Sequence, residues 1–201
     1  MRHALLALAL IAAPAIAQPA GKPGAPDVSR VQAGTYTVDP NHTQVLWSVD
    51  HMGFSVLQGA FGSPTGTLTL DPKNPAAAKL SLTFPMTAIT TTSAMFKEHL
   101  SSANWFDVAK YPEATFVSTK VAASGRGAQV TGNLTIKGVT RPVTLQAKFY
   151  GAGTNPMSKA TTVGFSATGT VRRSDFGLGA AVPVVDDQVQ LTINGAFEKQ
   201  S

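Results

Sequence analysis

The chain has 201 residues, of which 43% are hydrophobic and 13% are charged, and this charged share is well below the ~25% typical of soluble domains. The length predicts one domain of ordinary size. The sequence contains no cysteine, which excludes a disulfide scaffold, thiol catalysis, a zinc finger and a cysteine-linked lipid anchor. The formal net charge is +5, but the basic residues are scattered, whereas nucleic-acid binding needs them clustered on one face. We therefore expect no nucleic-acid partner.

Residues 1–17 predict a secretory signal peptide. A basic start is followed by an apolar run from Ala4 to Ala13 and by the small-residue pattern Ala15-Ile16-Ala17. The apolar run is shorter than the ~20 residues that a membrane helix needs. Cleavage before Gln18 reduces the formal charge from +5 to +4 because Arg2 is lost. We expect the mature protein to be periplasmic and to have no membrane span.

The mature chain divides into a leader and one domain. Residues 18–33 are rich in Pro, Gly and Ala, a composition typical of a flexible segment. Residues 34–199 carry many short runs in which apolar and polar side chains alternate, which predicts strands. In chain order, the clear alternations lie at 45–50, 67–70, 79–84, 143–150, 162–171 and 189–197, and less regular strands are expected near 36–38, 55–61, 115–121 and 129–136.

Turn and helix signals fall between these runs. Residues 71–75 and 125–127 suit loops, and residues 136–139 suit a tight hairpin. Residues 93–106 break the alternation, since apolar side chains there recur at helical spacing behind Ser93, a suitable N-cap. The sequence thus predicts an all-β domain with a short helical insertion at about 93–106.

Repeated alternation favours a β-sandwich or a closed barrel. A barrel of about eight strands can hold one small ligand in its lumen. Alternation does not say which face is outside, but the short predicted strands and the 7% aromatic content argue against an outer-membrane barrel, whose strands run to about 10 residues and carry aromatic girdles.

Catalytic motifs are sparse. The sequence has no G-x-S-x-G elbow and no P-loop lysine motif. Outside the signal peptide, three histidines, His42, His51 and His99, lie on separate elements and would have to converge to hold a metal. We expect no metal site and no cofactor, and we expect His42 and His99 to bond to backbone or loop groups.

Three polar residues are candidates for the head of a ligand. His51 shares the strand phase of Val45, and a buried imidazole needs a hydrogen-bond partner. Arg173 shares the phase of Val171 and must find an acceptor or emerge at the rim. Asp175, two residues further on, is the nearest such acceptor. Two interpretations stay open: the three side chains satisfy one another or the backbone, or they contact a polar head group.

Several fragments together resemble one family. They are Tyr36-Thr37-Val38-Asp39, His42-Thr43, Val49-Asp50-His51-Met52-Gly53, Gly59-Ala60-Phe61, His99-Leu100, Asn104-Trp105-Phe106-Asp107, Tyr111-Pro112, Gly132 to Thr140 and Arg173-Ser174-Asp175-Phe176-Gly177. Their order resembles the YceI-like polyisoprenoid-binding family of exported bacterial proteins, over about residues 34–199. Two departures keep the chemical type, since Thr43 stands where Ser is common and Trp105 where Phe is common.

The resemblance implies a lipocalin-like, eight-stranded antiparallel barrel whose apolar lumen holds a long isoprenoid-type or other amphiphilic chain. The family is not an established enzyme class. Strand phase supplies these candidates for the tunnel wall: Val45, Trp47, Val49, Leu80, Leu82, Phe84, Val143, Leu145, Phe149, Val163, Phe165, Leu191 and Ile193. Phe96 and Leu100 would cap the lumen or dock the helix, and Phe106 and Phe176 would shape a barrel end. Because the inward face of a small barrel is also its core, some of these side chains would only pack.

The leading hypothesis is a non-enzymatic periplasmic carrier of a polyisoprenoid, quinone or other long-chain amphiphile, with His51, Arg173 and Asp175 as head-group candidates. Two alternatives stay open. One is an enzyme that acts on such lipids, and the other is a stress-linked interaction module with no lipid ligand. A long tail would favour sharing between two copies, so a homodimer is also left open.

Overall fold

The computed structural model describes residues 21–200, and the expected signal peptide lies outside them. The strands are β1 (Gly34–Val38), β2 (Gln44–His51), β3 (Ser55–Phe61), β4 (Thr65–Leu70), β5 (Lys79–Pro85), β6 (Glu113–Ser124), β7 (Gly127–Ile136), β8 (Val139–Thr154), β9 (Thr161–Arg172) and β10 (Gln188–Lys199). The helices are α1 (Ala94–Ser101) and the 3-10 turns η1 (Val28–Arg30), η2 (Pro75–Ala77), η3 (Met86–Ala88) and η4 (Arg173–Phe176).

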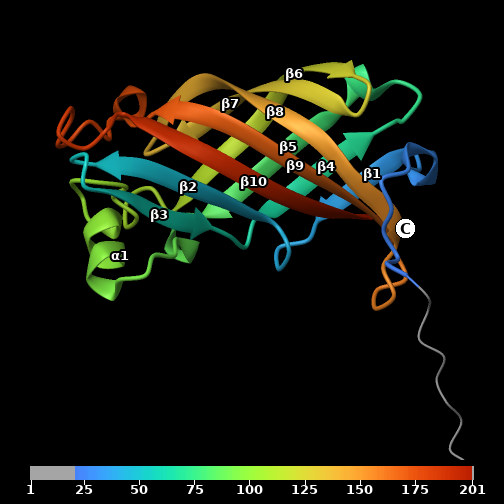
Figure 1. The fold of residues 1–201 in the computed structure, drawn as a ribbon, viewed down its shortest axis with the longest axis horizontal. Helices are drawn as coiled ribbons and strands as arrows, with labels where there is room; N and C mark the ends of the chain where they lie inside the picture. Colours follow the sequence, from blue (N-terminus) through green and yellow to red (C-terminus); the bar gives the residue numbers. More distant parts are fainter. Residues whose placement is uncertain (1–20, 201) are drawn as a thin grey trace, which may run out of the picture.

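The strands form one antiparallel sheet that closes on itself (Figure 1). Its order is β1-β4-β5-β6-β7-β8-β9-β10, and β1 pairs back with β10. β1 and β2 lie end to end along the same strand, because β10 pairs with β1 at Phe197 and with β2 at Ile193. The β2–β3 hairpin therefore extends the pair formed by β1 and β4. The first two long strands of the barrel are therefore each interrupted once, at 39–43 and at 62–64. The predicted closed, eight-stranded antiparallel barrel is confirmed.

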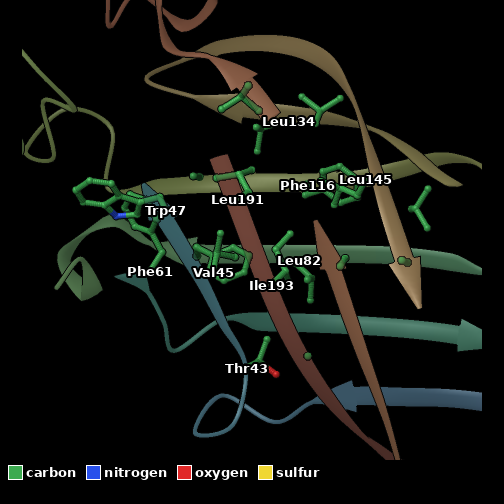
Figure 2. A pocket seen from close by; sticks show the side chains of 18 of the residues that line it. Thr43, Val45, Trp47, Phe61, Leu82, Phe116, Leu134, Leu145, Leu191 and Ile193 are labelled. Atoms are coloured by element: carbon green, nitrogen blue, oxygen red, sulfur yellow. The ribbon is translucent and has the colours of Figure 1, made fainter. Parts of the chain in front are cut away.

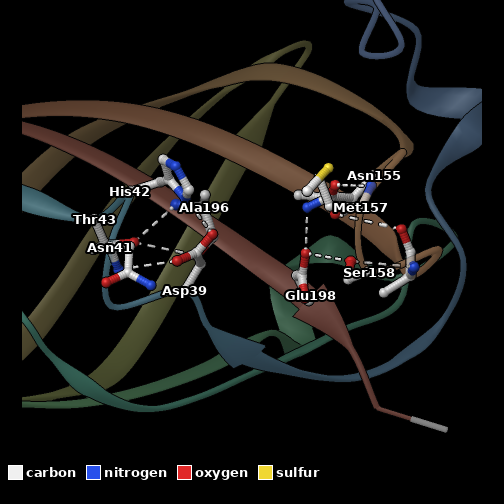
Figure 3. Close-up of polar contacts among 11 residues, drawn as sticks. Asp39, Asn41, His42, Thr43, Asn155, Met157, Ser158, Ala196 and Glu198 are labelled. Carbon is white, nitrogen blue, oxygen red and sulfur yellow. Dashed lines mark hydrogen bonds and ion pairs between the residues drawn. The ribbon is translucent and has the colours of Figure 1, made fainter.

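Side-chain bonds span the interruption between β1 and β2 (Figure 3). Thr43 Oγ1 donates to the Ala196 carbonyl at 3.2 Å and accepts from the Ala196 N–H at 3.0 Å, so a hydroxyl replaces the missing strand pair. His42 Nδ1 lies 2.6 Å from Asp39 Oδ2, while the His42 side chain is 73% exposed. Burial opposes ionisation of Asp39, but the hydrogen bonds from His42 and from the Asn41 N–H outweigh it and lower the pKa of Asp39.

The long strands exceed the lengths that alternation predicts. β8 has 16 residues and carries a register shift between Phe149 and Gly151. After such a bulge, the residues that would have faced inward face outward, and the reverse. Gly151 and Gly153 have no side chains, so the alternation of apolar and polar residues is not visible in this part of β8. Thr144, Gln146 and Lys148 on β8 and Gln190 and Thr192 on β10 are exposed. The apolar side chains that alternate with them line the interior of the barrel.

The helix and the tight hairpin appear where predicted. Ser93 Oγ accepts from the Phe96 N–H at 3.3 Å and caps α1. The helix ends at Ser101, and residues 102–112 are mostly turns, so it is shorter than the predicted 93–106. The β7–β8 connection consists of Lys137 and Gly138 with φ of 51° and 74°, the type I′ geometry that matches the twist of a hairpin.

Residues 21–33, which we call the N-terminal strap, lie against β8. The Ala25 N–H donates to the Ala152 carbonyl at 3.0 Å, and the Ala152 N–H donates to the Ala25 carbonyl at 2.9 Å. Val31 is buried. This arrangement differs from the flexible leader expected from composition, because Pro- and Gly-rich composition describes the free segment and not the strand edge on which it can dock.

Within residues 21–200 the core consists of three clusters of buried side chains. The first lies beside the strap around Tyr36, Val163 and Phe197. The second joins the β2–β3 hairpin to α1, and the third packs η4 against β8. No helix within residues 21–200 has both the length and the apolar character required to cross a membrane.

Candidate functional site

A cavity of about 650 Å³ occupies the barrel lumen. It extends from Val28 and Pro72, at the end covered by the strap, to His99 and Trp105, at the end covered by α1. Helix α1 and the N-terminal strap lie at opposite ends of the barrel (Figure 1). The lining is formed almost entirely by apolar side chains, so the lumen suits an elongated apolar molecule.

Every predicted tunnel residue except Val163 lines this cavity. The lining members of the prediction are Val45, Trp47, Val49, Leu80, Leu82, Phe84, Phe96, Leu100, Phe106, Val143, Leu145, Phe149, Phe165, Phe176, Leu191 and Ile193. Val163 is 0% exposed and packs in the cluster beside the strap. On β9 it pairs with Ala152, which follows the bulge of β8 and belongs to the same buried cluster.

Several inward residues on the predicted strands are only half-buried. Val45 on β2, Leu145 on β8 and both Leu191 and Ile193 on β10 belong to this group. Since they point into the lumen (Figure 2), they present apolar area to the cavity. These positions can gain contacts when a ligand enters.

Sequence reasoning missed part of the wall, including Phe61, Phe116 and Leu134 (Figure 2). β6 and β7 alternate less regularly, so their phase gave no candidates. The structure shows that Phe116 needs a glycine beside it, because a Cβ on Gly132 would lie 2.4 Å from Phe116 Cζ. Phe116 pairs with Leu134 and Gly132 pairs with Ser118, so the Phe116 ring extends diagonally over Gly132 on the neighbouring strand.

Trp47 lies against the opposite wall in the same manner. A Cβ on its cross-strand neighbour Gly59 would lie 2.3 Å from Trp47 Cζ2. The Trp47 side chain is buried, and among residues 21–200 its Nε1 is the buried side-chain atom without a hydrogen-bond partner. Glycine at position 59 is thus required by the indole, a relation that single-strand periodicity does not reveal.

The α1 end of the cavity is rich in aromatic rings. Trp47 meets Phe96 edge-on at 6.4 Å between ring centroids, and Phe61 meets Phe106 edge-on at 5.6 Å. His99 packs against Phe96 at 6.3 Å and against Trp105 at 5.1 Å. The expectation that His99 bonds to a loop group is wrong for the part of the chain described, because its ring packs among aromatic rings instead.

Arg173 lies at this end, and backbone carbonyls surround its guanidinium. Its Nε donates to the Asp186 carbonyl at 2.8 Å. One terminal nitrogen donates to the carbonyls of Leu178 and Ala180, and the other donates to the Val185 carbonyl at 2.8 Å. Burial lowers the pKa of Arg173, while Asp187 and Asp186 oppose that shift. These four bonds hold the β9–β10 connection closed and use four of the five N–H donors of the guanidinium, which also lines the cavity.

The expected pair between Arg173 and Asp175 is not formed. Asp175 is exposed and lies outside the cavity lining. The acidic partner in this region is Asp187, which accepts from the Ser174 N–H at 2.8 Å, from Ser174 Oγ at 2.7 Å and from Arg172 Nε at 3.1 Å. The prediction selected Asp175 because it is the carboxylate nearest to Arg173 in the sequence. In the fold, Asp187, which directly precedes β10, lies next to Arg172.

His51 is the remaining polar candidate on the wall. It is half-buried, lines the cavity and forms an isolated bridge with Val185, so it borders the same closed connection. His99 on α1 also lines this end of the cavity, whereas His42 lies in the β1–β2 connection. Within residues 21–200 no cluster of His, Asp and Glu suitable for a metal ion occurs. A polar group at the α1 end would therefore meet the imidazoles of His51 and His99 among aromatic rings.

Comparisons with known proteins agree with this architecture. The protein YceI of Escherichia coli is 40% identical over 164 residues, which cover 81% of this chain and 85% of that protein. The crystal structure of BcnA from Burkholderia cenocepacia is 28% identical, with a TM-score of 0.71, and the match covers 79% of this chain and 98% of BcnA.

A third structure shares the fold at lower identity. It is described as a polyisoprenoid binding domain from Saccharophagus degradans implicated in plant cell wall breakdown, and it is 13% identical with a TM-score of 0.59. The match covers 84% of this chain and all of that domain. The family model described as "YceI-like domain" matches residues 36–197. The chain therefore belongs to the YceI-like family.

Proposed function

We propose that this protein binds a polyisoprenoid, an isoprenoid quinone or a similar long-chain amphiphile in its barrel lumen, and that it acts as a carrier and not as an enzyme. The observation that carries the proposal is the apolar cavity, which runs from one end of the barrel to the other. The polyisoprenoid-binding description of the structural neighbour from Saccharophagus degradans supports the ligand class.

The driving force would be hydrophobic. Each Å² of apolar surface removed from water contributes about 25 cal/mol before the cost of ordering the chain. The cavity volume of about 650 Å³ lies within the range of roughly 300–1,000 Å³ typical of ligand pockets. Half-buried wall residues such as Leu191 and Ile193 would lose their remaining exposure when the ligand enters.

The ligand's polar head would lie at the α1 end beside His51, and its tail would point toward the strap. His51 supports this orientation because it is a half-buried wall residue capable of hydrogen bonding. Arg173 serves there as a structural clamp, since four of its five N–H donors are engaged by backbone carbonyls. We also propose export to the periplasm, which the signal-peptide pattern of residues 1–17 supports.

A matched pair of variants on β10 tests the lumen as the binding site. Leu191→Trp fills the cavity. Thr192→Trp places tryptophan at the next position, where the side chain is exposed on the outer face of the barrel. Geranylgeraniol in a mild detergent should raise the Tm of the parent and of Thr192→Trp. It should raise the Tm of Leu191→Trp much less. No stabilisation of the parent, or equal stabilisation of both variants, would contradict binding in the lumen.

A further inference from the structure

We propose that the N-terminal strap, residues 21–33, acts as a stop at one end of the cavity and limits the length of the apolar chain that the barrel accepts. This inference rests on the proposed function. The strap precedes residues 36–197, which match the family model. It would therefore add a specificity-determining element to the barrel shared by the family.

Backbone and side-chain bonds hold the strap in place. Ala25 exchanges two backbone hydrogen bonds with Ala152 on β8, at 3.0 and 2.9 Å. Asp27 caps η1 by accepting from the N–H and the hydroxyl of Ser29, at 2.9 and 2.7 Å. Arg30 lies 3.6 Å from Asp27 and donates to the Pro23 carbonyl at 3.3 Å. The strap is thus folded on itself as well as paired with the barrel.

Two glycines on β8 provide the surface on which the strap lies. A Cβ on Gly153 would lie 2.1 Å from the Pro23 carbonyl oxygen, and one on Gly151 would lie 3.0 Å from the Ala25 carbonyl oxygen. Real Cβ atoms do not approach a backbone oxygen as closely as 2.1 Å, so a side chain at position 153 and the observed strap cannot coexist. The edge of β8 is therefore shaped to receive this segment.

The strap contributes two side chains to the end of the lumen. Val31 is 9% exposed and packs in the cluster that contains Val38 and Phe149. Val28 lines the cavity and is 51% exposed. Gly34 pairs with Leu70, so the end of the strap adjoins the β4–β5 connection, whose Pro72 also lines the cavity. An apolar chain that extends from the α1 end would meet these residues.

A stop has a measurable consequence for selectivity. Each added isoprene unit strengthens binding only while it enters the lumen, because units that pass beyond the wall stay in water. With the strap docked, affinity should rise with chain length and then level off. With the strap displaced, the lumen is longer and the affinity should continue to rise.

The test uses the complete mature protein with Gly153→Ala, and Gly164→Ala as its matched control. A Cβ on Gly164 makes ordinary contact, 3.7 Å from the nearest atom, and this residue lies on the neighbouring strand β9. Trypsin cleavage after Arg30 reports strap release, and the prenol series farnesol, geranylgeraniol and solanesol reports selectivity. Ala25→Pro, which removes the Ala25 N–H donor, provides a second route to release.

The expected result is faster cleavage after Arg30 in Gly153→Ala or Ala25→Pro, together with a preference for solanesol over geranylgeraniol that rises by about threefold or more relative to Gly164→Ala. Unchanged cleavage in both variants, or strap release with an unchanged prenol preference, would overturn the stop. If neither the parent nor Gly164→Ala binds any prenol, the proposed function itself fails, and this outcome is distinct from the other two.

Discussion

The α1 end of the barrel is closed by aromatic rings and a clamped arginine, whereas the strap end is closed by aliphatic side chains of a segment that precedes the first strand. At the α1 end, Arg173 and Trp105 lie in segments within the family match, and the Arg173 guanidinium lies 5.7 Å from the Trp105 ring centroid. At the strap end, Val28 and Val31 lie before that match. One end thus relies on a buried polar network and the other on apolar contact.

This difference indicates separate tasks for the two ends. A charged group bonded to several carbonyls is costly to disturb, so the α1 end should be rigid. A short segment joined to one strand edge can be displaced without loss of the barrel's own pairing. We infer that the α1 end maintains the fold around a polar head, while the strap end adjusts the space for the tail.

The largest effect should come from Arg173→Ala at the α1 end. The substitution leaves the carbonyls of Leu178, Ala180, Val185 and Asp186 without their shared donor. We expect the free energy of unfolding to fall by roughly 3 kcal/mol or more. Urea denaturation of the purified variant measures this, and a loss below about 1 kcal/mol would show that the network does not clamp this end.

Gly59→Ala should have the next largest effect. The added methyl group would lie 2.3 Å from Trp47 Cζ2 and 2.5 Å from the Thr90 carbonyl oxygen. The indole must shift, and we expect a loss of about 1–3 kcal/mol in the free energy of unfolding together with weaker prenol binding. Gly62→Ala, whose Cβ meets nothing within 4 Å, is the control. Equal stability of the two variants would refute the close packing of Trp47.

Val31→Ala tests the strap end and should cost less than either change. The Val31 side chain is buried in the apolar cluster but belongs to the displaceable strap. We expect a loss of about 1 kcal/mol or less in the free energy of global unfolding. Trypsin cleavage after Arg30 should nevertheless become faster. A loss as large as that of Arg173→Ala would remove the contrast between the ends.

The smallest effect concerns pH and Asp187. Burial opposes ionisation of this carboxyl, but hydrogen bonds from Ser174 and Arg172 outweigh it and lower the pKa of Asp187 in the folded state. Its contribution to stability is thus complete above the unfolded-state pKa of about 3.9 and is lost as the pH falls through the lower folded-state pKa. Asp187→Asn should reduce the fall in Tm below about pH 4. If the Tm of the parent and the Tm of Asp187→Asn fall in parallel as the pH is lowered, Asp187 does not contribute to the pH dependence of stability.

The all-β class could be predicted because burial on one face of a strand leaves a period of two in the sequence. The choice of a closed barrel over a sandwich came from the family resemblance. The period of two identified Leu191 and Ile193 as wall residues, and both line the cavity. It also placed Val163 on the inward face correctly, but this side chain packs in the core cluster beside the strap and does not line the cavity. The alternation of residues within one strand does not reveal how that strand packs against its neighbours.

The polar features were less accessible to sequence reasoning. The bonds between Asp187 and Ser174 join residues 13 positions apart, so the nearer Asp175 was chosen instead. The strap was missed for a related reason: its docking depends on Gly153, more than a hundred residues further along the chain. Contacts between irregular segments that are far apart in the chain produce no repeating pattern in the sequence, so they could not be predicted from it.

Native mass spectrometry of the protein purified from its natural host shows whether the lumen holds a long-chain isoprenoid or a similar lipid. We predict one added mass per chain and, after organic extraction, a single class of isoprenoid or quinone. Isolation of the bare protein mass, with no change in Tm when polyprenyl lipids are added, would contradict lipid binding and favour an interaction module whose lumen serves only as a core.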